Sequence, residues 1–206
     1  MKKTAIAIAL CSLAIISSQA SAQQVQEGPW LVRLRAVYLN PSDHSDPIGG
    51  VGASDRLTIN SKTIPDLDIS YFFTPNWATE LVLTYPQKQK VALDGNNIGN
   101  FKHLPPTLTL QYHFMPDQQF SPYLGAGVNY TRISSVNLLG GAAKLESSST
   151  GLALQTGFDY KIDKNWSLNF DVKKIQISSD VITAGGKISK VKIDPLLIGV
   201  GVGYRF

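Results

Sequence analysis

Cysteine is nearly absent from this chain of 206 residues, because the only one, Cys11, lies close to the N-terminus. It falls inside an apolar run at residues 5–16, which follows two lysines and precedes the small-x-small cleavage site ASA at residues 20–22. This layout is typical of a secretory signal peptide, so we expect residues 1–22 to be cleaved and residues 23–206 to form one domain. The mature chain would then contain no cysteine. A disulfide or a thiolate metal site is therefore excluded, although the leader directs the chain to an oxidising compartment.

A strong excess of charge and a helical hydrophobic pattern are also missing. Without the leader the chain has 17 basic and 15 acidic side chains, a net charge of +2, so nucleic-acid binding is not expected. No window of the mature chain keeps an apolar period of about 3.6 residues over the length of a normal helix. The apolar run of the leader is shorter than the about 20 residues that a membrane-spanning helix requires. The mature protein is therefore expected to be nearly all β.

Alternation of apolar and polar residues with a period of two recurs along the whole mature chain. It predicts eight strands, each about as long as a tilted membrane-spanning strand requires. The predicted strands are residues 29–39, 64–73, 77–85, 104–115, 122–131, 150–161, 166–177 and 192–206.

The connections between these strands alternate strictly between short and long. The short ones are residues 74–76, 116–121 and 162–165, and the long ones are residues 40–63, 86–103, 132–149 and 178–191. A soluble sandwich has no reason to sort its connections by length. The pattern predicts an all-β, eight-stranded antiparallel up-and-down transmembrane β-barrel with short periplasmic turns and long extracellular loops.

The two faces of the predicted strands differ in chemistry. One face is apolar, and its aromatic residues gather at the strand ends, as they do at headgroup depth in membrane proteins. Near the short turns these are Trp30, Phe73, Trp77, Phe114, Tyr160, Trp166, Tyr204 and Phe206, and near the long connections they are Tyr38, Tyr85 and Tyr130. The apolar face is therefore expected to contact lipid. The alternative, a soluble lipocalin-like barrel, would have to bury the charges at residues 33, 35, 66 and 68 or expose the aromatic face.

The last predicted strand ends in LLIGVGVGYRF, residues 196–206, where large apolar residues alternate with three glycines. The large residues are expected to face acyl chains, and the glycines to relieve crowding inside a narrow barrel. Pairing of this strand with the first would leave no open edge in the hydrocarbon. The terminal Phe206 resembles the signal that outer-membrane assembly machinery recognises, so that machinery is an expected partner.

Six segments carry a resemblance to a known family. They are EGPWLVRLRAVYLNP at residues 27–41, DISYFFTPNWATEL at 68–81, LPPTLTLQYHF at 104–114, FSPYLGAGVNYT at 120–131, FDYKIDKNWSLNFDVKKI at 158–175 and DPLLIGVGVGYRF at 194–206. Together they are similar to the OmpW family (OmpW/AlkL-like) over nearly the whole mature chain. The resemblance implies a barrel in the outer membrane of a Gram-negative cell, with membrane lipids and small hydrophobic solutes as partners. It also implies a channel for such solutes, with lateral release from the barrel wall into the membrane.

Charges of both signs face inward in the predicted barrel. The cations are Arg33, Arg35, Lys173 and Arg205, and the anions are Asp66, Asp68, Glu80, Asp159 and Asp171. An eight-stranded barrel is narrow enough for side chains to fill it, so we expect these charges to pair and to plug the lower lumen. The alternative is a purely structural role for the same residues.

The long connections contain apolar residues that a solvated loop would not need. Those assigned to a hydrophobic vestibule at the extracellular end are Ile98, Phe101, Leu104, Val136, Leu138, Leu139, Val181 and Ile182. A solute that entered there would meet the plug and leave sideways. Pro86, Pro105 and Pro106 mark the expected lateral opening, because proline lacks an N–H and interrupts strand pairing. The alternative is that these prolines only begin and end strands.

An outer-membrane enzyme and a display protein are the other functional classes. Catalysis needs a nucleophile beside a base, and the sequence places no such partner next to His44, His103 or His113. Asp43, His44 and Asp46 are the candidate metal ligands, but they lie in one surface loop. We therefore expect no enzyme, no cofactor and no metal site. A structural, adhesion or receptor-type barrel with a plugged lumen and no transport remains the alternative function.

Overall fold

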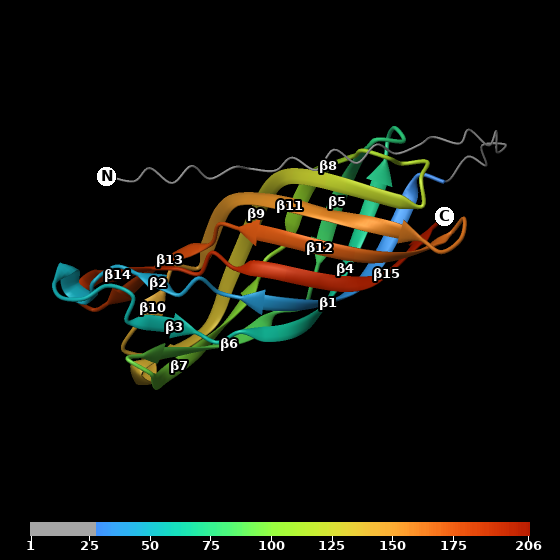
Figure 1. The fold of residues 1–206 in the computed structure, drawn as a ribbon. Helices are drawn as coiled ribbons and strands as arrows, with labels where there is room; N and C mark the ends of the chain where they lie inside the picture. The colour runs from blue at the N-terminus through green and yellow to red at the C-terminus, as the bar shows by residue number, and fades with distance from the viewer. Residues whose placement is uncertain (1–27) are drawn as a thin grey trace, which may run out of the picture.

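Eight antiparallel strands close into a barrel (Figure 1). The computed structural model describes residues 28–206, so the predicted signal peptide lies outside the described part of the chain. In spatial order the barrel strands are β1 (Trp30–Asn40), β4 (Lys62–Phe72), β5 (Trp77–Leu83), β8 (Thr107–His113), β9 (Phe120–Leu138), β11 (Ser148–Lys161), β12 (Trp166–Ile175) and β15 (Leu196–Arg205). Pairing of β15 with β1 completes the ring. The predicted eight-stranded antiparallel barrel is confirmed.

Several strand boundaries differ from the predicted ones, and proline explains two of the differences. The predicted fourth strand is divided, because β7 (Asn96–Leu104) ends before Pro105 and β8 begins after Pro106. Neither proline can donate a backbone hydrogen bond to a neighbouring strand. The predicted eighth strand began at residue 192, whereas β15 begins directly after Pro195.

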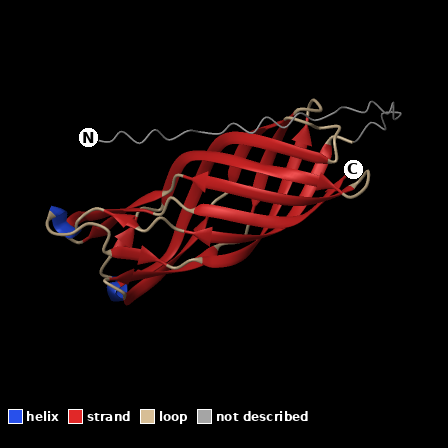
Figure 2. Cartoon of the chain, in the orientation of Figure 1, coloured by secondary structure: helices blue, strands red, loops and turns tan. Residues whose placement is uncertain are grey.

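Much of the long connections is also strand (Figure 2). β6 (Gln87–Leu93) and β7 form one hairpin, and β13 (Ser178–Thr183) and β14 (Gly186–Lys192) form another. The shorter elements are β2 (His44–Ser45), β3 (Leu57–Ile59), β10 (Lys144–Leu145) and the 3-10 turns η1 (Ile48–Gly50) and η2 (Leu139–Gly141). The extracellular end is therefore an extension of sheet beyond the barrel. No helix within residues 28–206 is long and apolar enough to cross a membrane.

Burial alternates along the barrel strands in the sense opposite to that of a soluble protein. On β1, Leu34 is 58% exposed, whereas its neighbours Arg33 and Arg35 are 0% and 3% exposed. On β15, Val200 is 56% exposed and faces outward in the same way. The apolar side chains therefore cover the outside of the barrel, and the charged ones are enclosed.

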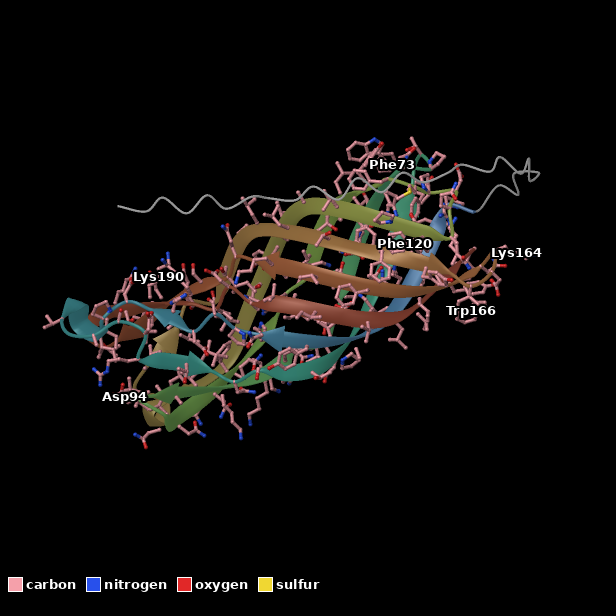
Figure 3. The ribbon with its side chains drawn as sticks, viewed as in Figure 1. Phe73, Asp94, Phe120, Lys164, Trp166 and Lys190 are labelled. Atoms are coloured by element: carbon pink, nitrogen blue, oxygen red, sulfur yellow. The ribbon has the colours of Figure 1, made fainter. Side chains whose placement is uncertain are left out.

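Aromatic residues form a belt at the end with the short turns. Figure 3 shows Phe73, Phe120 and Trp166 at this end, while Asp94 and Lys190 lie at the opposite one. Neighbouring rings are in contact: the centroids of Trp30 and Tyr71 lie 4.8 Å apart, and those of Trp166 and Tyr204 lie 4.9 Å apart. The C-terminal Phe206 belongs to the same belt, with its backbone N–H donating to the carbonyl oxygen of Trp30 at 2.9 Å. Recognition of Phe206 by assembly machinery stays a prediction.

The seam between β1 and β15 depends on glycine. Gly201 lies opposite Arg35, and a Cβ atom at this position would lie 2.1 Å from the carbonyl oxygen of Leu34. At Gly199 a Cβ atom would lie 3.2 Å from a methyl group of Val37, a side chain that can move. The backbone contact at Gly201 is therefore the stricter constraint on barrel closure.

Replacing Gly201 by alanine is expected to lower the free energy of unfolding by about 1–3 kcal/mol, the usual cost of overpacking. The matched variant Gly199→Ala is expected to lose clearly less, because only a side chain must shift. Urea unfolding in lipid vesicles, followed by tryptophan fluorescence, measures both variants. Equal stabilities would show that close backbone approach at Gly201 is not limiting.

Candidate functional site

A cluster of ion pairs fills the middle of the barrel, with Arg33 at its centre. Its Nη1 lies 3.0 Å from Oδ1 of Asp68 on β4, and its Nη2 lies 2.7 Å from Oδ2 of Asp159 on β11. All three residues are buried. Arg33 therefore joins β1 to its neighbour β4 and to the more distant strand β11.

The remaining charges extend this cluster across the bore. Nη2 of Arg35 lies 3.1 Å from Oδ1 of Asp66 and 2.9 Å from Oδ2 of Asp68. Nζ of Lys173 on β12 lies 2.7 Å from Oε1 of Glu80 on β5. The charged residues alternate with lipid-facing ones in sequence, and closure of the sheet brings them together inside.

Neutral side chains donate further hydrogen bonds to the carboxylate oxygens of Glu80 and Asp171. Gln111 Nε2 donates to Oε2 of Glu80 at 2.9 Å, and Gln155 Nε2 donates to Oδ2 of Asp171 at 2.6 Å. The hydroxyl group of Tyr123 donates to the same Asp171 oxygen at 2.8 Å. The sequence reasoning missed Tyr123, whose position next to outward-facing Leu124 was the available signal. Together these groups close the lumen with a hydrogen-bonded layer.

Arg205 was assigned to the same plug, but the structure places it at the periplasmic end. Its guanidinium lies 4.0 Å from the ring centroid of Phe72, and its Nε donates to the carbonyl oxygen of Gly28 at 2.8 Å. It is the last residue of β15 and lies opposite Leu31, two residues below the position of Arg33 on β1. The role of Arg205 in the plug of the lower lumen stays a prediction.

Above the charged layer, the hairpins at the extracellular end surround an almost wholly apolar cavity of about 100 Å³, the upper cavity. Its lining residues are Ile48, Leu57, Ile59, Val91, Leu93, Ile98, Phe101, Leu138, Leu139, Ala143, Leu145, Ser179, Val181, Ile188, Ser189, Val191 and Ile193. Five of the residues assigned to the vestibule are therefore brought together here: Ile98, Phe101, Leu138, Leu139 and Val181.

The other three assigned residues do not line this cavity, and strand alternation explains why. Ile182 follows Val181 on β13 and is 38% exposed on the opposite face. Leu104 lies at the end of β7, on the face opposite to Phe101, and Val136 packs against the buried cluster without reaching the cavity. Their assignment to the lining is corrected.

Several lining residues were missed because their segments were taken as loops. Leu57 and Ile59 alternate with a polar residue on β3, so period-two alternation was the available signal for them. Ile188 and Val191 lie three residues apart on β14, so a single period-two alternation does not reveal both.

A second, smaller space of about 30 Å³, the lower cavity, lies between the charged layer and the upper cavity. Arg35, Asp66 and Lys173 border it from the charged layer. Ile64 of β4 and Pro105 border it from the wall. The lower cavity therefore lies between the charged layer and the part of the barrel wall that contains Ile64 and Pro105.

The wall beside the lower cavity has a break in its backbone pairing. The β4–β5 ladder ends at the pair Leu67 and Leu83, and in the described chain no ladder joins β4 at residues 62–66 to residues 84–90. The side-chain contacts across this lateral gap are long: Thr84 Oγ1 donates to the carbonyl oxygen of Pro65 at 3.5 Å, and Lys62 Nζ donates to that of Lys88 at 3.5 Å. Backbone pairing resumes at the outer end of the gap, where Asn60 N–H donates to the carbonyl oxygen of Lys90 at 3.3 Å and β3 pairs with β6.

The three prolines assigned to a lateral opening lie on the far side of this gap. Pro86 lies within the segment that leaves β5, and Pro105 lines the lower cavity. On their other side the wall stays joined, because Tyr130 N–H donates to the carbonyl oxygen of Pro106 at 3.1 Å. The break therefore faces β4 and not β9.

The three histidines lie in separate environments. His44 is in the exposed β2 segment, with Nδ1 3.3 Å from Oδ1 of Asp55. His113 is buried in the lumen, with Nε2 3.2 Å from Oε1 of Gln111. His103 is buried on β7, and burial lowers its pKa to about 4. Within residues 28–206, no group of three His, Cys, Asp or Glu side chains is placed to hold a metal ion.

A closed β-barrel with an apolar exterior, aromatic belts and an enclosed charged layer defines an outer-membrane β-barrel protein. A sequence profile of the OmpW family matches residues 26–206, and the chain belongs to this family. Outer membrane protein W of Vibrio cholerae is 34% identical to this chain, and the match covers 96% of this chain and 98% of that protein. The outer-membrane protein y4mB of Sinorhizobium fredii is 46% identical over 185 residues, which cover 86% of this chain and 80% of that one.

The fold comparison agrees with the family. The crystal structure of OprG from Pseudomonas aeruginosa superposes with a TM-score of 0.76 at 30% identity, covering 87% of this chain and 97% of that chain. The predicted family and the outer-membrane location are confirmed.

Replacing Arg33 by methionine is expected to lower the free energy of unfolding by about 3–5 kcal/mol, because Asp68 and Asp159 would be left buried without their cation. Arg56→Met is the matched control. Arg56 pairs with Asp94 at the exposed extracellular end, where water screens the interaction, and little change is expected. Urea unfolding in vesicles measures both, and equal losses would contradict a specific role for burial.

Proposed function

We propose that the protein is a channel for small hydrophobic molecules, which enter the upper cavity from outside and leave through the lateral gap into the membrane. The observation that carries the proposal is the apolar cavity above a closed layer of ion pairs. Burial of apolar surface contributes about 25 cal/mol per Å², so such a cavity favours apolar solutes over water. No catalytic step and no cofactor are part of the proposal.

The charged layer makes straight passage unfavourable for an apolar solute. To pass, the solute would have to separate Arg33, Arg35 and Lys173 from their carboxylates in a low-dielectric environment. Breaking one buried pair costs about 3–5 kcal/mol, and the layer contains several. An apolar solute also offers no hydrogen bonds in exchange.

The lateral gap offers an exit that leaves the charged layer intact. Ile64, Thr84 and Pro105 border the lower cavity, and residues 62–66 and 84–90 are the two sides of the gap. Widening the gap at residues 62–66 breaks two long side-chain hydrogen bonds, and the nearest backbone pairing is the bond from Asn60 N–H to the carbonyl oxygen of Lys90 at its outer end. The gap also lies level with Tyr38, which pairs with Thr63 at the outer edge of the lipid-facing surface. A solute released at this height would enter the outer leaflet.

The upper cavity can be tested with a charge placed in a loop, where folding is least disturbed. Ile48→Glu puts a carboxylate on the cavity lining, whereas Val51→Glu changes a residue that is 79% exposed in the same loop. Ile48→Glu is expected to weaken binding of a hydrophobic dye about tenfold, or roughly 1.4 kcal/mol, and Val51→Glu to leave it unchanged. Dye titration of the purified proteins in nanodiscs measures this. Absence of saturable dye binding in the wild type would favour the display alternative.

The lateral gap can be tested by tying its two sides together. The mature chain has no cysteine, so a Lys62→Cys, Lys88→Cys pair can be joined with a cleavable bismaleimide. Dye entry into proteoliposome membranes is expected to fall toward that of empty liposomes and to recover on cleavage. The control pair Tyr38→Cys, Thr63→Cys spans an intact ladder and should not respond. Undiminished entry after full cross-linking would refute lateral exit here.

A further inference from the structure

Three buried polar side chains lie between the upper and lower cavities. Gln87 and Gln89 on β6 lie opposite His103 and Phe101 on β7. Gln87 and Gln89 are 0% exposed and His103 is 1% exposed, while Lys88 between the glutamines is exposed. Alternation therefore turns Gln87, Gln89 and His103 toward the interior. We call them the amide–imidazole group.

Most polar atoms of this group have no hydrogen-bond partner in the protein. Gln87 Nε2 donates to the carbonyl oxygen of Tyr85 at 3.0 Å. Its Oε1, both amide atoms of Gln89 and both ring nitrogens of His103 have no partner among residues 28–206. Unpaired buried polar atoms are costly and therefore rare in native proteins. Leucine or valine would avoid this cost, and the same strand has valine at position 91 and leucine at position 93.

Of this group His103 lines a cavity, and Gln87 and Gln89 lie beside His103 and Phe101 on the paired strand β6. Phe101 lines the upper cavity and His103 lines the lower one, with ring centroids 5.9 Å apart. Apolar residues of one buried cluster, including Ile177 and Ile193, wall both cavities. The amide–imidazole group therefore lies beside the junction of the two cavities, above the charged layer.

The chemistry of the group matches an uncharged head group. Burial, with a smaller effect of the Lys62 charge, lowers the pKa of His103 to about 4, so the imidazole is neutral at neutral pH. A neutral imidazole and two primary amides together offer both donors and acceptors. A hydroxyl group donates and accepts, so it can pair with them, whereas a hydrocarbon leaves every one unpaired.

We propose that the solute is an amphiphilic alcohol, whose apolar part occupies the upper cavity and whose hydroxyl group binds Gln87, Gln89 and His103. This inference rests on the proposed function, since it names the solute class of the same channel. A site built to pair with a hydroxyl group rejects the analogue that lacks it, because the polar atoms of the site then stay unpaired. The amide–imidazole group would therefore select alcohols over alkanes of the same length.

The test compares 1-octanol with octane. Each displaces the probe 1-N-phenylnaphthylamine from the protein in nanodiscs, and affinities are referred to free aqueous concentrations so that bilayer partition cancels. We expect 1-octanol to bind about tenfold more tightly than octane. Gln89→Leu and His103→Phe are each expected to remove most of this preference, with octane bound as well as before or better. Gln176→Leu, the same change at an exposed glutamine, should keep the preference.

The outcomes separate this inference from the proposed function. Equal affinities for 1-octanol and octane in the wild type, or an unchanged preference in both variants, would overturn the inference and leave the channel standing. Replacement of an unpaired buried amide by leucine should not impair folding, and His103→Phe provides an independent second variant. If neither molecule displaces the probe saturably, the proposed function fails and the inference fails with it.

Discussion

The closed ring of backbone hydrogen bonds is the constraint on which the rest of the structure depends. In hydrocarbon an unpaired N–H or C=O has no water to bind, so β15 must meet β1 along its whole length. Eight strands then fix a narrow bore, whose inward residues touch one another. The same constraint determines where the wall can open. Opening is permitted only where pairing has already ended, and that occurs beside residues 62–66 of β4, at the outer edge of the membrane.

Because the inward charges are enclosed in a narrow bore, they pair with one another and close it. In water an arginine and a carboxylate gain little by pairing, but in a narrow bore each charge needs its partner and further hydrogen bonds. Glu80 illustrates this, because one carboxylate is held by Lys173 and by the amides of Gln111 and Gln155. The layer is therefore a single network, and a solute cannot displace one member without exposing the others. Its closure and its rigidity have the same physical origin.

The barrel and its charged layer could be predicted from the sequence because one alternation encodes both. Around the plug, outward apolar residues alternate with inward polar ones, as Leu34 does with Arg33 and Arg35, so strand number, lipid-facing side and the identity of the plug follow together. The extracellular end was harder, since segments such as residues 87–91 (QKQKV) are polar on both faces and look like solvated loops. The lateral gap could not be placed, because it depends on where the β4–β5 register ends. Prolines mark one side of the gap but not the strand from which it separates.

The interior changes in steps from the extracellular end downward: apolar surface, neutral amides and imidazole, then ion pairs. Burial in the apolar upper layer lowers the free energy of an apolar chain. In the ion-pair layer such a chain would break pairs without forming hydrogen bonds, so its free energy is lowest above the charged layer. The lower cavity is the deepest place where apolar surface, at Ile64 and Pro105, is still available, and it is also where the wall is unpaired. In the proposed channel the direction of exit follows from the order of these layers. The proposed polar patch at Gln87, Gln89 and His103 would act on a solute before it reached the exit, where selectivity has the most effect on what is released.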